Sequence, residues 1–399
     1  MKVAFLTAGG IAPCLSASIV SLIKFYKHSN VNVEFIGYLN GYKGLLKGNS
    51  IQISNDLYKY ENDIYLFGGS FIGNSRVKLS NINDCIKNNY IKSNEIPLEV
   101  AAKQLVKDKI DVLHTIGGDD TNTTAADLVD YLDKNNYKLT VVGLPKTIDN
   151  DIIPLKQTLG AYTAAENSSI FFKNIVNENT TSSRQLIIHE VMGRHCGWLT
   201  AYSSYLYMKE LNKKSFFPAA GLNKNKWSIH AIYIPEKEFN LEKESIRLNK
   251  IMNQYDCVNI FLSEGAGIDN IIKEKEQNGE KISKDAFGHV RLDEINPGIW
   301  YSNYFKKKLK CDKVLVQKSG YFSRSAAPNK EDIELINNHT KLAVDCALES
   351  KSGVIGIDDE NDKLSCINFS RIKGGKPFDT NTDWFKKLLE NIENNKFIH

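Results

Sequence analysis

The stretch that decides the fold is VLHTIGGDD at residues 112–120. Its apolar run predicts a buried strand, and the glycine pair after it is typical of a tight turn into a helix. The same arrangement, an apolar run that ends in Gly-Gly, recurs in VAFLTAGG at residues 3–10 and in IYLFGGS at residues 64–70. Glycines at strand ends let backbone N–H groups approach a phosphate closely. The pairs that end at Gly10, Gly69 and Gly118 therefore predict a phosphate site at one edge of a sheet.

Outward from these turns, short apolar runs alternate with helical patterns along the whole chain. The predicted strands cover residues 3–7, 33–38, 64–67, 112–116, 139–143, 185–191, 230–234, 258–262 and 314–317. The predicted helices cover residues 98–107, 123–133, 161–175 and 243–253. Strands that are apolar throughout are typical of sheets covered by helices on both faces. The pattern predicts an α/β doubly wound fold, and 399 residues favour two domains.

Composition excludes several classes of protein. The chain is 42% hydrophobic and 25% charged, with a formal net charge of +4, which does not favour binding to nucleic acid or to a membrane. No apolar run reaches the length of about 18 residues that a transmembrane helix needs. The seven cysteines form no CxxC pair, which favours a reducing compartment. The start, MKVAFLTAGG, is predicted to be a strand and not a signal peptide. We therefore expect a cytoplasmic protein.

Two further patterns bear on the class of enzyme and on which segments are exposed. The chain has no GxxxxGK[ST] motif and no complete GxGxxG motif, which argues against a P-loop nucleotidase and against a dinucleotide dehydrogenase. The Lys-rich segments 209–226 and 271–284 are predicted to be solvated loops or exposed helices.

Two groups of carboxylates follow predicted strands. They comprise Asp119 and Asp120 after Gly118, and the segment PKTIDND with Lys146, Thr147, Asp149 and Asp151. Mg²⁺ prefers oxygen ligands, usually one or two carboxylates together with substrate phosphates. Phosphoryl transfer also needs a base and cations around the transferred group. An extended backbone would put Asp149 and Asp151 on one face. The alternative for Asp119 and Asp120 is that they only cap a helix that begins near Thr121.

Arginines near other strand ends are candidates for binding phosphate groups. They are Arg76 in GGSFIGNSR, Arg184 at the start of a predicted strand, Arg194 in MGRH, and Arg324 in SGYFSRSA. Guanidinium groups bind phosphates in a bidentate manner, although each arginine taken singly is also compatible with an ordinary surface position. His195 and Cys196 adjoin Arg194 without a partner that would make a nucleophile, so we interpret them as packing residues.

At these residues the sequence resembles the phosphofructokinase family, and within it the branch that uses pyrophosphate. The resemblance runs from AGGIAPCLSAS near the start to GGKPFD at residues 374–379. It rests on GGDDTNT, PKTIDND and EVMGRHCGW in the family's order and spacing. It implies reversible, Mg²⁺-dependent transfer of a phosphoryl group from pyrophosphate to the 1-hydroxyl of fructose 6-phosphate. It also implies two Rossmann-like domains: residues 1–160 with about 323–373 for the donor and Mg²⁺, and residues 161–322 with about 374–399 for the sugar phosphate.

Carried over position by position, the resemblance implies a role for each candidate residue. Asp149 is implied as the base, supported by Asp151. Thr147 is implied at the transferred phosphoryl group, and Asp119 at Mg²⁺. The implied donor-binding residues are Gly10, Arg76, Gly118, Asp120 and Lys146, the last also being catalytic. The implied sugar-phosphate residues are Met192, Gly193, the catalytic Arg194, Glu236, Tyr321 and Arg324. Arg184 is implied to reach into a neighbouring subunit's site, which predicts a homodimer or homotetramer.

The choice of phosphoryl donor depends on Asp120 and Lys146. ATP-dependent relatives resemble GGDG and PGTID at these places, whereas this chain has GGDD and PKTID. A carboxylate at Asp120 would occupy and repel the α-phosphate of ATP, and Lys146 would favour compact pyrophosphate. Departures from the ATP-dependent pattern include Ile11 in place of an aspartate, and Leu315 in place of a second 6-phosphate arginine. Lys313 or Lys318 could substitute for that arginine.

Two alternatives stay open at this point. One is an ATP-dependent sugar-phosphate, lipid or NAD-type kinase, because those kinases share a GGDG-like loop. The other is a non-catalytic regulatory or sugar-phosphate binding protein on the same fold. The Asp120/Lys146 pair argues against the first, and the presence of both Asp119 and Asp149 argues against the second.

Overall fold

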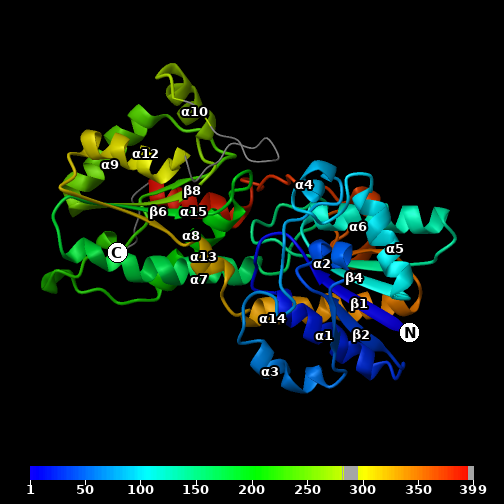
Figure 1. The fold of residues 1–399 in the computed structure, drawn as a ribbon. Coiled ribbons are helices and arrows are strands. Elements are labelled where there is room, and N and C mark those ends of the chain that lie inside the picture. The colour runs from blue at the N-terminus through cyan, green and yellow to red at the C-terminus, as the bar shows by residue number, and fades with distance from the viewer. Residues whose placement is uncertain (281, 283–294, 394–399) are drawn as a thin grey trace. The chain divides into compact units, whose positions relative to one another are not determined.

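The computed structural model describes residues 1–280, 282 and 295–393. The chain divides into two compact units. Unit 1 contains Met1–Ala164 and Arg324–Lys376, and unit 2 contains Ala165–Ser323 and the chain from Pro377 onward. The chain passes between the units within α7 (Ala161–Ile175), within α13 (Gly320–Arg324), and between Lys376 and Pro377. Each unit has its own sheet with helices on both faces (Figure 1).

Unit 1 is built on a seven-stranded sheet with the order β11-β10-β5-β4-β1-β2-β3. The strands are β1 Lys2–Thr7, β2 Glu34–Tyr38, β3 Ser50–Ile53, β4 Val112–Gly117, β5 Thr140–Pro145, β10 Gly353–Ile357 and β11 Leu364–Ile367. The five inner strands are parallel, and β3 and β11 close the two edges as antiparallel strands. The chain runs from β1 to β2 on one side and returns to β4 on the other. The switch point where such sheets bind ligands therefore lies between β1 and β4.

Helices cover both faces of this sheet. They are α1 Leu15–His28, α2 Tyr42–Lys47, α3 Glu61–Ile64, α4 Ile82–Lys87, α5 Pro97–Lys107, α6 Asp119–Lys134 and α14 Lys330–Leu348, with 3₁₀ turns η1 Leu57–Tyr60 and η5 Phe369–Arg371. Helices α1 and α14 lie on one face, and α2, α5 and α6 lie on the other (Figure 1). A buried hydrogen bond of 2.7 Å joins Tyr26 on α1 to His114 on β4. Apolar side chains of β1, α2, α5 and α6 form a continuous core on the opposite face.

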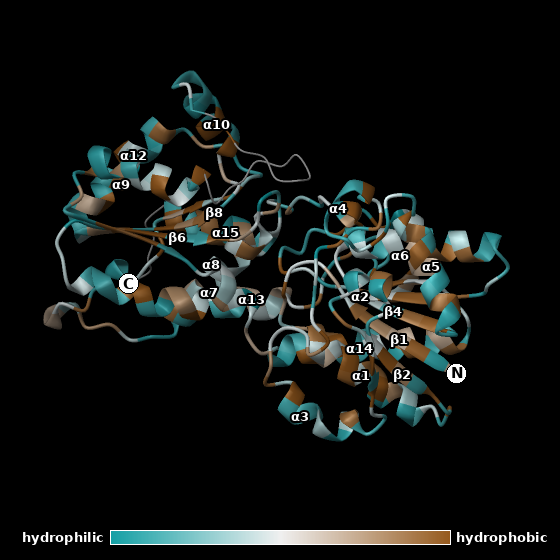
Figure 2. Cartoon of the chain, viewed as in Figure 1, coloured by the Kyte–Doolittle hydropathy of each residue, from teal (hydrophilic) through white to brown (hydrophobic). Residues whose placement is uncertain are grey.

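Unit 2 is built on a four-stranded, wholly parallel sheet with the order β7-β8-β6-β9. The strands are β6 Gln185–Val191, β7 Ala231–Tyr233, β8 Cys257–Ser263 and β9 Lys313–Lys318. The remaining helices are α8 Trp198–Asn212, α9 Leu241–Tyr255, α10 Ile268–Gln277, α12 Pro297–Leu309 and α15 Asp383–Glu393, with 3₁₀ turns η2 Val176–Thr180, η3 Pro218–Ala220 and η4 Lys224–Lys226. Helices α9 and α12 pack on one face, and α7, α8 and α15 cover the other. The strands at the centre of both units are hydrophobic, and the outward helix faces are hydrophilic (Figure 2).

Most of the predicted elements are confirmed. The bounds predicted for residues 185–191 and 161–175 agree fully with β6 and α7, and seven other predicted strands and three other helices overlap observed ones. The two elements whose bounds agree fully contain no glycine or proline. Segment 209–226 is largely exposed beyond the end of α8, as predicted. Segment 271–284 begins in the exposed helix α10, and its residues 281, 283 and 284 lie outside the described residues. Within the described chain, no helix has the length and hydropathy needed to cross a membrane.

The strand predicted at residues 64–67 is wrong. Glu61–Ile64 form helix α3, and Leu66 and Phe67 are 73% and 65% exposed in the turn that follows. A four-residue apolar run is too short to distinguish a strand from the end of a helix. The short strands β3, β10 and β11 were not predicted. Two of them, β3 and β11, are edge strands of only four residues, which are too short for a clear pattern.

Candidate active site

Three neighbouring strands of unit 1 end together at the switch point of its sheet. Thr7 of β1 pairs with Ile116 of β4, and Gly117 of β4 pairs with Pro145 of β5. The loops that follow carry the first glycine pair, the acids after Gly118, and the PKTIDND segment. Because the strands are parallel, the predicted donor and catalytic residues gather at one edge of the sheet.

Lys146 is the buried cation at this edge. Its side chain is only 4% exposed, and Nζ donates a hydrogen bond of 2.7 Å to the carbonyl oxygen of Gly10. The lysine after β5 thus crosses the end of β4 to the loop after β1. Burial lowers the pKa of Lys146 to about 8, and the charges of Arg324 and Arg76 act in the same direction. Asp149 and Cys14 oppose this shift.

The buried lysine predicts a gain in stability when it is replaced. In the unfolded chain its pKa is the ordinary 10.5, so at neutral pH the native state holds the ammonium at a cost. We expect Lys146→Met to raise the free energy of unfolding at pH 7 by about 1 to 3 kcal/mol, after the lost hydrogen bond to Gly10 is counted. Between pH 8 and 10.5 the unfolded state binds more protons, so the wild-type protein gains stability and the difference shrinks. Urea unfolding of both proteins at pH 7 and pH 10 measures this, and a less stable variant at pH 7 would contradict it.

Two arginines surround the same glycine loop. A Cβ atom on Gly10 would lie 2.7 Å from Nη1 of Arg324 and 3.6 Å from Nη2 of Arg76, so both guanidinium groups lie close to this glycine. Arg324 also donates to the carbonyl oxygen of Ile11 at 3.3 Å. Arg76 is carried by a segment paired with the loop, where Gly9 N donates to the carbonyl oxygen of Ser75 at 2.8 Å. We call Arg76, Lys146 and Arg324 the cationic cluster.

Three carboxylates gather beside the cationic cluster. Burial, together with the charges of Asp149 and Asp119, raises the pKa of Asp151 to about 7. Thr147 donates its hydroxyl to Oδ1 of Asp151 at 3.2 Å, and its Oγ1 accepts the N–H of Asp149 at 3.1 Å. Thr147 thus links the two acids. Mutual repulsion makes the three carboxylates a place where one proton or one cation is bound favourably.

The backbone between Asp149 and Asp151 is not extended, so that premise of the prediction is wrong. Asn150 lies in the left-handed region with a φ of 55°. Its side-chain oxygen accepts the N–H of Thr158 at 2.9 Å, which stabilises a conformation that asparagine tolerates better than most residues. The two acids are electrostatically coupled in spite of the tight turn.

Asp119 and Asp120 do not cap α6, which excludes the alternative considered for them. The N-cap is Gly118, with an extended backbone, and both acids lie in the first helical turn, where the helix dipole favours negative charge. Asp120 is 60% exposed and forms an ion pair of 2.5 Å with Lys78. Lys78 was missed in the sequence, because 42 residues separate it from Asp120 and no motif contains it.

The second glycine pair packs against this site although it does not follow a strand. The N–H of Ser16 donates to the carbonyl oxygen of Gly69 at 2.8 Å, and Gly69 N donates to Ala12 at 3.4 Å. A Cβ on Gly68 would overlap the backbone of Ser325, the residue after Arg324. The pair supports the loop after β1 and the segment that carries Arg324.

The implied sugar-phosphate residues of unit 2 follow the carboxyl ends of its parallel strands. Met192, Gly193 and Arg194 follow β6, Glu236 follows β7, and Tyr321 follows β9. Gly193 has a φ of +125°, and a Cβ there would overlap the carbonyl oxygen of Cys196, so the MGR turn requires glycine. Cys196 is buried, in keeping with the packing role inferred for it, whereas His195 is exposed.

Glu236 is held by backbone N–H groups. Its carboxylate accepts Gly197 N at 2.8 and 3.0 Å, and Oε1 also accepts Phe378 N at 2.8 Å. These bonds fix the carboxylate at the end of the sheet. A role toward sugar hydroxyls stays a prediction.

Arg184 lies at the opposite end of β6 from the MGR turn. The seven residues of β6 lie between Arg184 and Met192, eight steps that span about 26 Å. Its guanidinium donates to the carbonyl oxygens of Leu309 and Lys310 at the end of α12, and to Asn253 Oδ1 at 2.9 Å. Within one chain, Arg184 therefore does not reach the candidate sugar-phosphate site formed after the end of β6.

The remaining 6-phosphate candidates are divided between the units. Tyr321, 72% exposed, belongs to unit 2, whereas Arg324 on the same short helix belongs to unit 1. The two lysines considered as substitutes for an arginine at Leu315 are both ion-paired: Lys313 with Glu178, and Lys318 with Glu190 at 2.8 Å.

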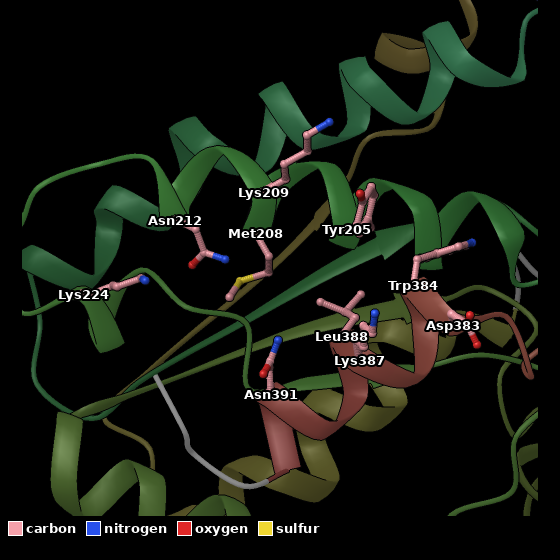
Figure 3. Close-up of a pocket in the computed structure, with 10 residues that line it drawn as sticks. All are labelled: Tyr205, Met208, Lys209, Asn212, Lys224, Asp383, Trp384, Lys387, Leu388 and Asn391. Atoms are coloured by element: carbon pink, nitrogen blue, oxygen red, sulfur yellow. The ribbon is translucent and has the colours of Figure 1, made fainter. Parts of the chain in front are cut away.

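A cavity of about 830 Å³ in unit 2 lies away from these residues, between α8 and α15. Met208 of α8 and Leu388 of α15 point toward one another across it (Figure 3). Lys224 and Asn212 lie at one end. No predicted site residue lines this cavity, so its size does not make it the active site.

The chain matches the family model described as Phosphofructokinase over residues 2–347, and it belongs to this family. A relative from Methylomonas methanica is 52% identical over 98% of this chain and 96% of its own length. Another, from Mastigamoeba balamuthi, is 51% identical over 98% of this chain and 95% of its own length. Both are named pyrophosphate–fructose 6-phosphate 1-phosphotransferase.

Solved structures have the same fold. The pyrophosphate-dependent phosphofructokinase from Nitrosospira multiformis aligns with a TM-score of 0.72 at 17% identity, over 99% of this chain and 91% of that one. The enzyme of the same description from Marinobacter aquaeolei aligns with a TM-score of 0.70 at 22% identity, with the same coverage. The predicted α/β fold with two doubly wound, Rossmann-like units is thereby confirmed as the phosphofructokinase fold.

Proposed function

We propose that this protein transfers a phosphoryl group reversibly from pyrophosphate to the 1-hydroxyl of fructose 6-phosphate. The observation that carries the proposal is the cationic cluster around Gly10, with the buried Lys146 at its centre. Pyrophosphate concentrates its charge in a small volume, and three cations converging on one glycine loop suit such a ligand. Asp120, which forms an ion pair with Lys78 at the start of α6, would disfavour a longer polyphosphate. The names of the relatives support the same donor and acceptor.

Mg²⁺ fits the acids of unit 1. Within the described residues no three His, Cys, Asp or Glu side chains form a ready-made metal centre. Mg²⁺ commonly relies instead on one or two carboxylates and completes its shell with substrate phosphates and water. The pKa of Asp151 is raised mainly by burial and in addition by the charges of Asp149 and Asp119, and a bound cation would offset that repulsion. We assign Asp119 as the protein ligand, and the bound cation would neutralise charge on the donor phosphates.

Asp149 is the proposed general base. It would accept the proton of the sugar 1-hydroxyl as that oxygen attacks the donor. The coupled pair of Asp149 and Asp151 can bind a proton near neutral pH, because the pKa of Asp151 lies at about 7. Thr147 forms hydrogen bonds with both acids and follows Lys146 in the chain, and we propose that its hydroxyl contacts the transferred group. Lys146, Arg76 and Arg324 would stabilise the charge that develops on it.

The acceptor would bind at the carboxyl ends of the unit 2 strands. Met192, Gly193 and Arg194 would line the sugar phosphate, Glu236 would accept sugar hydroxyls, and Tyr321 would contact the 6-phosphate. The full length of β6 lies between Arg184 and this site, so we propose that Arg184 serves the site of a second copy in a homo-oligomer. This role requires the guanidinium to exchange its bonds to α12 for the substrate's phosphate.

The direct test of this reaction is the formation of fructose 1,6-bisphosphate from fructose 6-phosphate and pyrophosphate. We expect product with Mg²⁺ and none when EDTA removes the metal. Product formation that is insensitive to EDTA would contradict the metal assignment. Pyrophosphate hydrolysis without sugar phosphorylation would contradict the acceptor.

The pH dependence of donor use tests the role of Lys146. Because kcat/KM reports the free enzyme, we expect kcat/KM for pyrophosphate to fall about tenfold per pH unit above a pKa near 8, as the ammonium loses its proton. The arginine in Lys146→Arg stays charged, so the fall in kcat/KM should move to higher pH in this variant. Both proteins are assayed with pyrophosphate, so the ionisation of pyrophosphate affects both pH profiles equally and does not contribute to the difference between them. A wild-type profile that is flat to pH 9.5 would contradict the assignment.

A further inference from the structure

The segment Gly374–Phe378, which we call the connecting segment, touches the candidate sites of both units. Its residues Gly374 to Lys376 belong to unit 1, and Pro377 and Phe378 belong to unit 2. The cationic cluster and the acids account for the chemistry of unit 1 without it. Its contacts therefore need an explanation of their own.

At its unit 1 end the connecting segment is fixed to the acids. A Cβ on Gly374 would overlap Oδ2 of Asp119, so any larger residue would have to displace this carboxylate. The N–H of Lys376 donates to the carbonyl oxygen of Asp151 at 2.9 Å. The Lys376 ammonium donates to Asp359 at 2.5 Å and to the carbonyl oxygen of Leu155. Just before the segment, Lys373 and Ile153 exchange backbone hydrogen bonds of 3.1 and 2.7 Å.

At its unit 2 end the connecting segment is fixed to Glu236. Phe378 N donates to Oε1 of Glu236 at 2.8 Å. The Phe378 ring is 7% exposed and packs on Trp384 and Phe385 of α15, with ring centroids 5.5 and 5.1 Å apart. The buried ring prevents the donor N–H from moving independently of unit 2.

The hydrogen bonds of Lys376 and Phe378 anchor the connecting segment at two points that are close together in sequence. Only Pro377 stands between Lys376, which bonds to Asp151, and Phe378, which bonds to Glu236. Proline has a fixed φ and no N–H, so this connection has less conformational freedom than any other two-residue link. A displacement of the loop that carries Asp119 and Asp151 is therefore transmitted along the chain to the group that orients Glu236.

We propose that the connecting segment is a positioning element that couples donor binding to sugar-phosphate binding. The inference rests on the proposed function, because it takes Asp119 to hold the metal and Glu236 to hold the sugar. Binding of the metal and donor fixes the Asp119 side of the segment, which favours the Glu236 geometry that binds the sugar phosphate. Such coupling is reciprocal, and its usual size is 5-fold to 150-fold in affinity.

Insertion of Gly-Gly between Lys376 and Pro377 tests the coupling, because it preserves every anchoring residue and lengthens the link between the two anchors. Calorimetry measures fructose 6-phosphate affinity with and without Mg²⁺ and methylenediphosphonate, a pyrophosphate analogue that cannot transfer. We expect at least fivefold tighter binding with the analogue in the wild-type protein, and less than twofold in the variant. The same insertion after the exposed Gly221 is the control and should keep the wild-type ratio. An insertion variant that keeps the full ratio, or a wild-type ratio of one, would overturn the proposal.

A second experiment measures binding of the pyrophosphate analogue without any sugar phosphate. Its result therefore does not depend on whether fructose 6-phosphate is the acceptor. Gly374→Ala places a methyl group against Asp119, and we expect Mg²⁺-dependent binding of methylenediphosphonate to weaken about tenfold with an unchanged melting temperature. Gly375→Asn is the matched control: Gly375 has a φ of +81°, which asparagine tolerates, and no neighbouring atom lies within 4 Å of an added Cβ. Wild-type affinity in Gly374→Ala would overturn the positioning role. Absence of fructose 6-phosphate binding to the wild-type protein would instead contradict the proposed function.

Discussion

Replacing Asp149 with serine is expected to lower kcat by about 10²-fold to 10⁴-fold, the usual contribution of a general base. Fructose 6-phosphate should still bind with nearly wild-type affinity, because the implied sugar-phosphate residues follow the strands of unit 2. The pKa of Asp151 should fall as well, since the charge of Asp149 contributes to its elevation. Steady-state kinetics together with calorimetric binding of fructose 6-phosphate measure both effects.

Asp151→Asn is the matched control for Asp149→Ser. It also removes one carboxylate of the coupled pair but leaves the proposed base in place. We expect a smaller fall in kcat than for Asp149→Ser. An unaltered kcat in Asp149→Ser, or a larger loss in the control, would contradict the general-base assignment.

The second large effect is expected from the double change Asp120→Gly with Lys146→Gly. Loss of Lys146 removes the centre of the cationic cluster and leaves the Gly10 carbonyl without its donor, so kcat/KM for pyrophosphate should fall by at least 10²-fold. Loss of Asp120 removes the carboxylate expected to exclude the α-phosphate of ATP, so measurable ATP-dependent turnover should appear. Initial rates with each donor at saturating fructose 6-phosphate measure the change.

The single variants separate the two contributions. Lys146→Gly alone should lose pyrophosphate use without gaining ATP use. Asp120→Gly alone removes the carboxylate of the Asp120–Lys78 ion pair and leaves Lys146 in place, so pyrophosphate use should be largely kept. Unchanged pyrophosphate kinetics in the double variant would show that another feature selects the donor.

The fold could be predicted from the sequence wherever local pattern and burial agree. Strand β6 is buried along its whole length and α7 is an uninterrupted helix, so both were bounded correctly. The segment 64–67 has a similarly apolar composition, yet its Leu66 and Phe67 are exposed, because no neighbouring strand is available to pair with it. Edge strands such as β3 have only four residues, so even an alternating sequence is too short to identify them.

The sequence was sufficient to predict which loops form the candidate site, but not which side chains in and around it touch one another. The parallel sheet alone brings the residues after β1, β4 and β5 together, which is why Gly10, Asp119 and Lys146 meet at one edge. The ion pair of Lys78 and the close approach of Gly374 to Asp119 depend on chain segments far apart in sequence. A single sequence carries no local signal for contacts of that kind.

The most direct test of the account is a comparison of phosphoryl donors with the wild-type protein. Fructose 6-phosphate and Mg²⁺ are supplied with either pyrophosphate or ATP, and fructose 1,6-bisphosphate is measured. Turnover with pyrophosphate and none with ATP is the predicted result, because the cationic cluster suits a compact donor and Asp120 disfavours a longer one. Turnover with ATP alone would contradict the account, although the fold and the acceptor would stand.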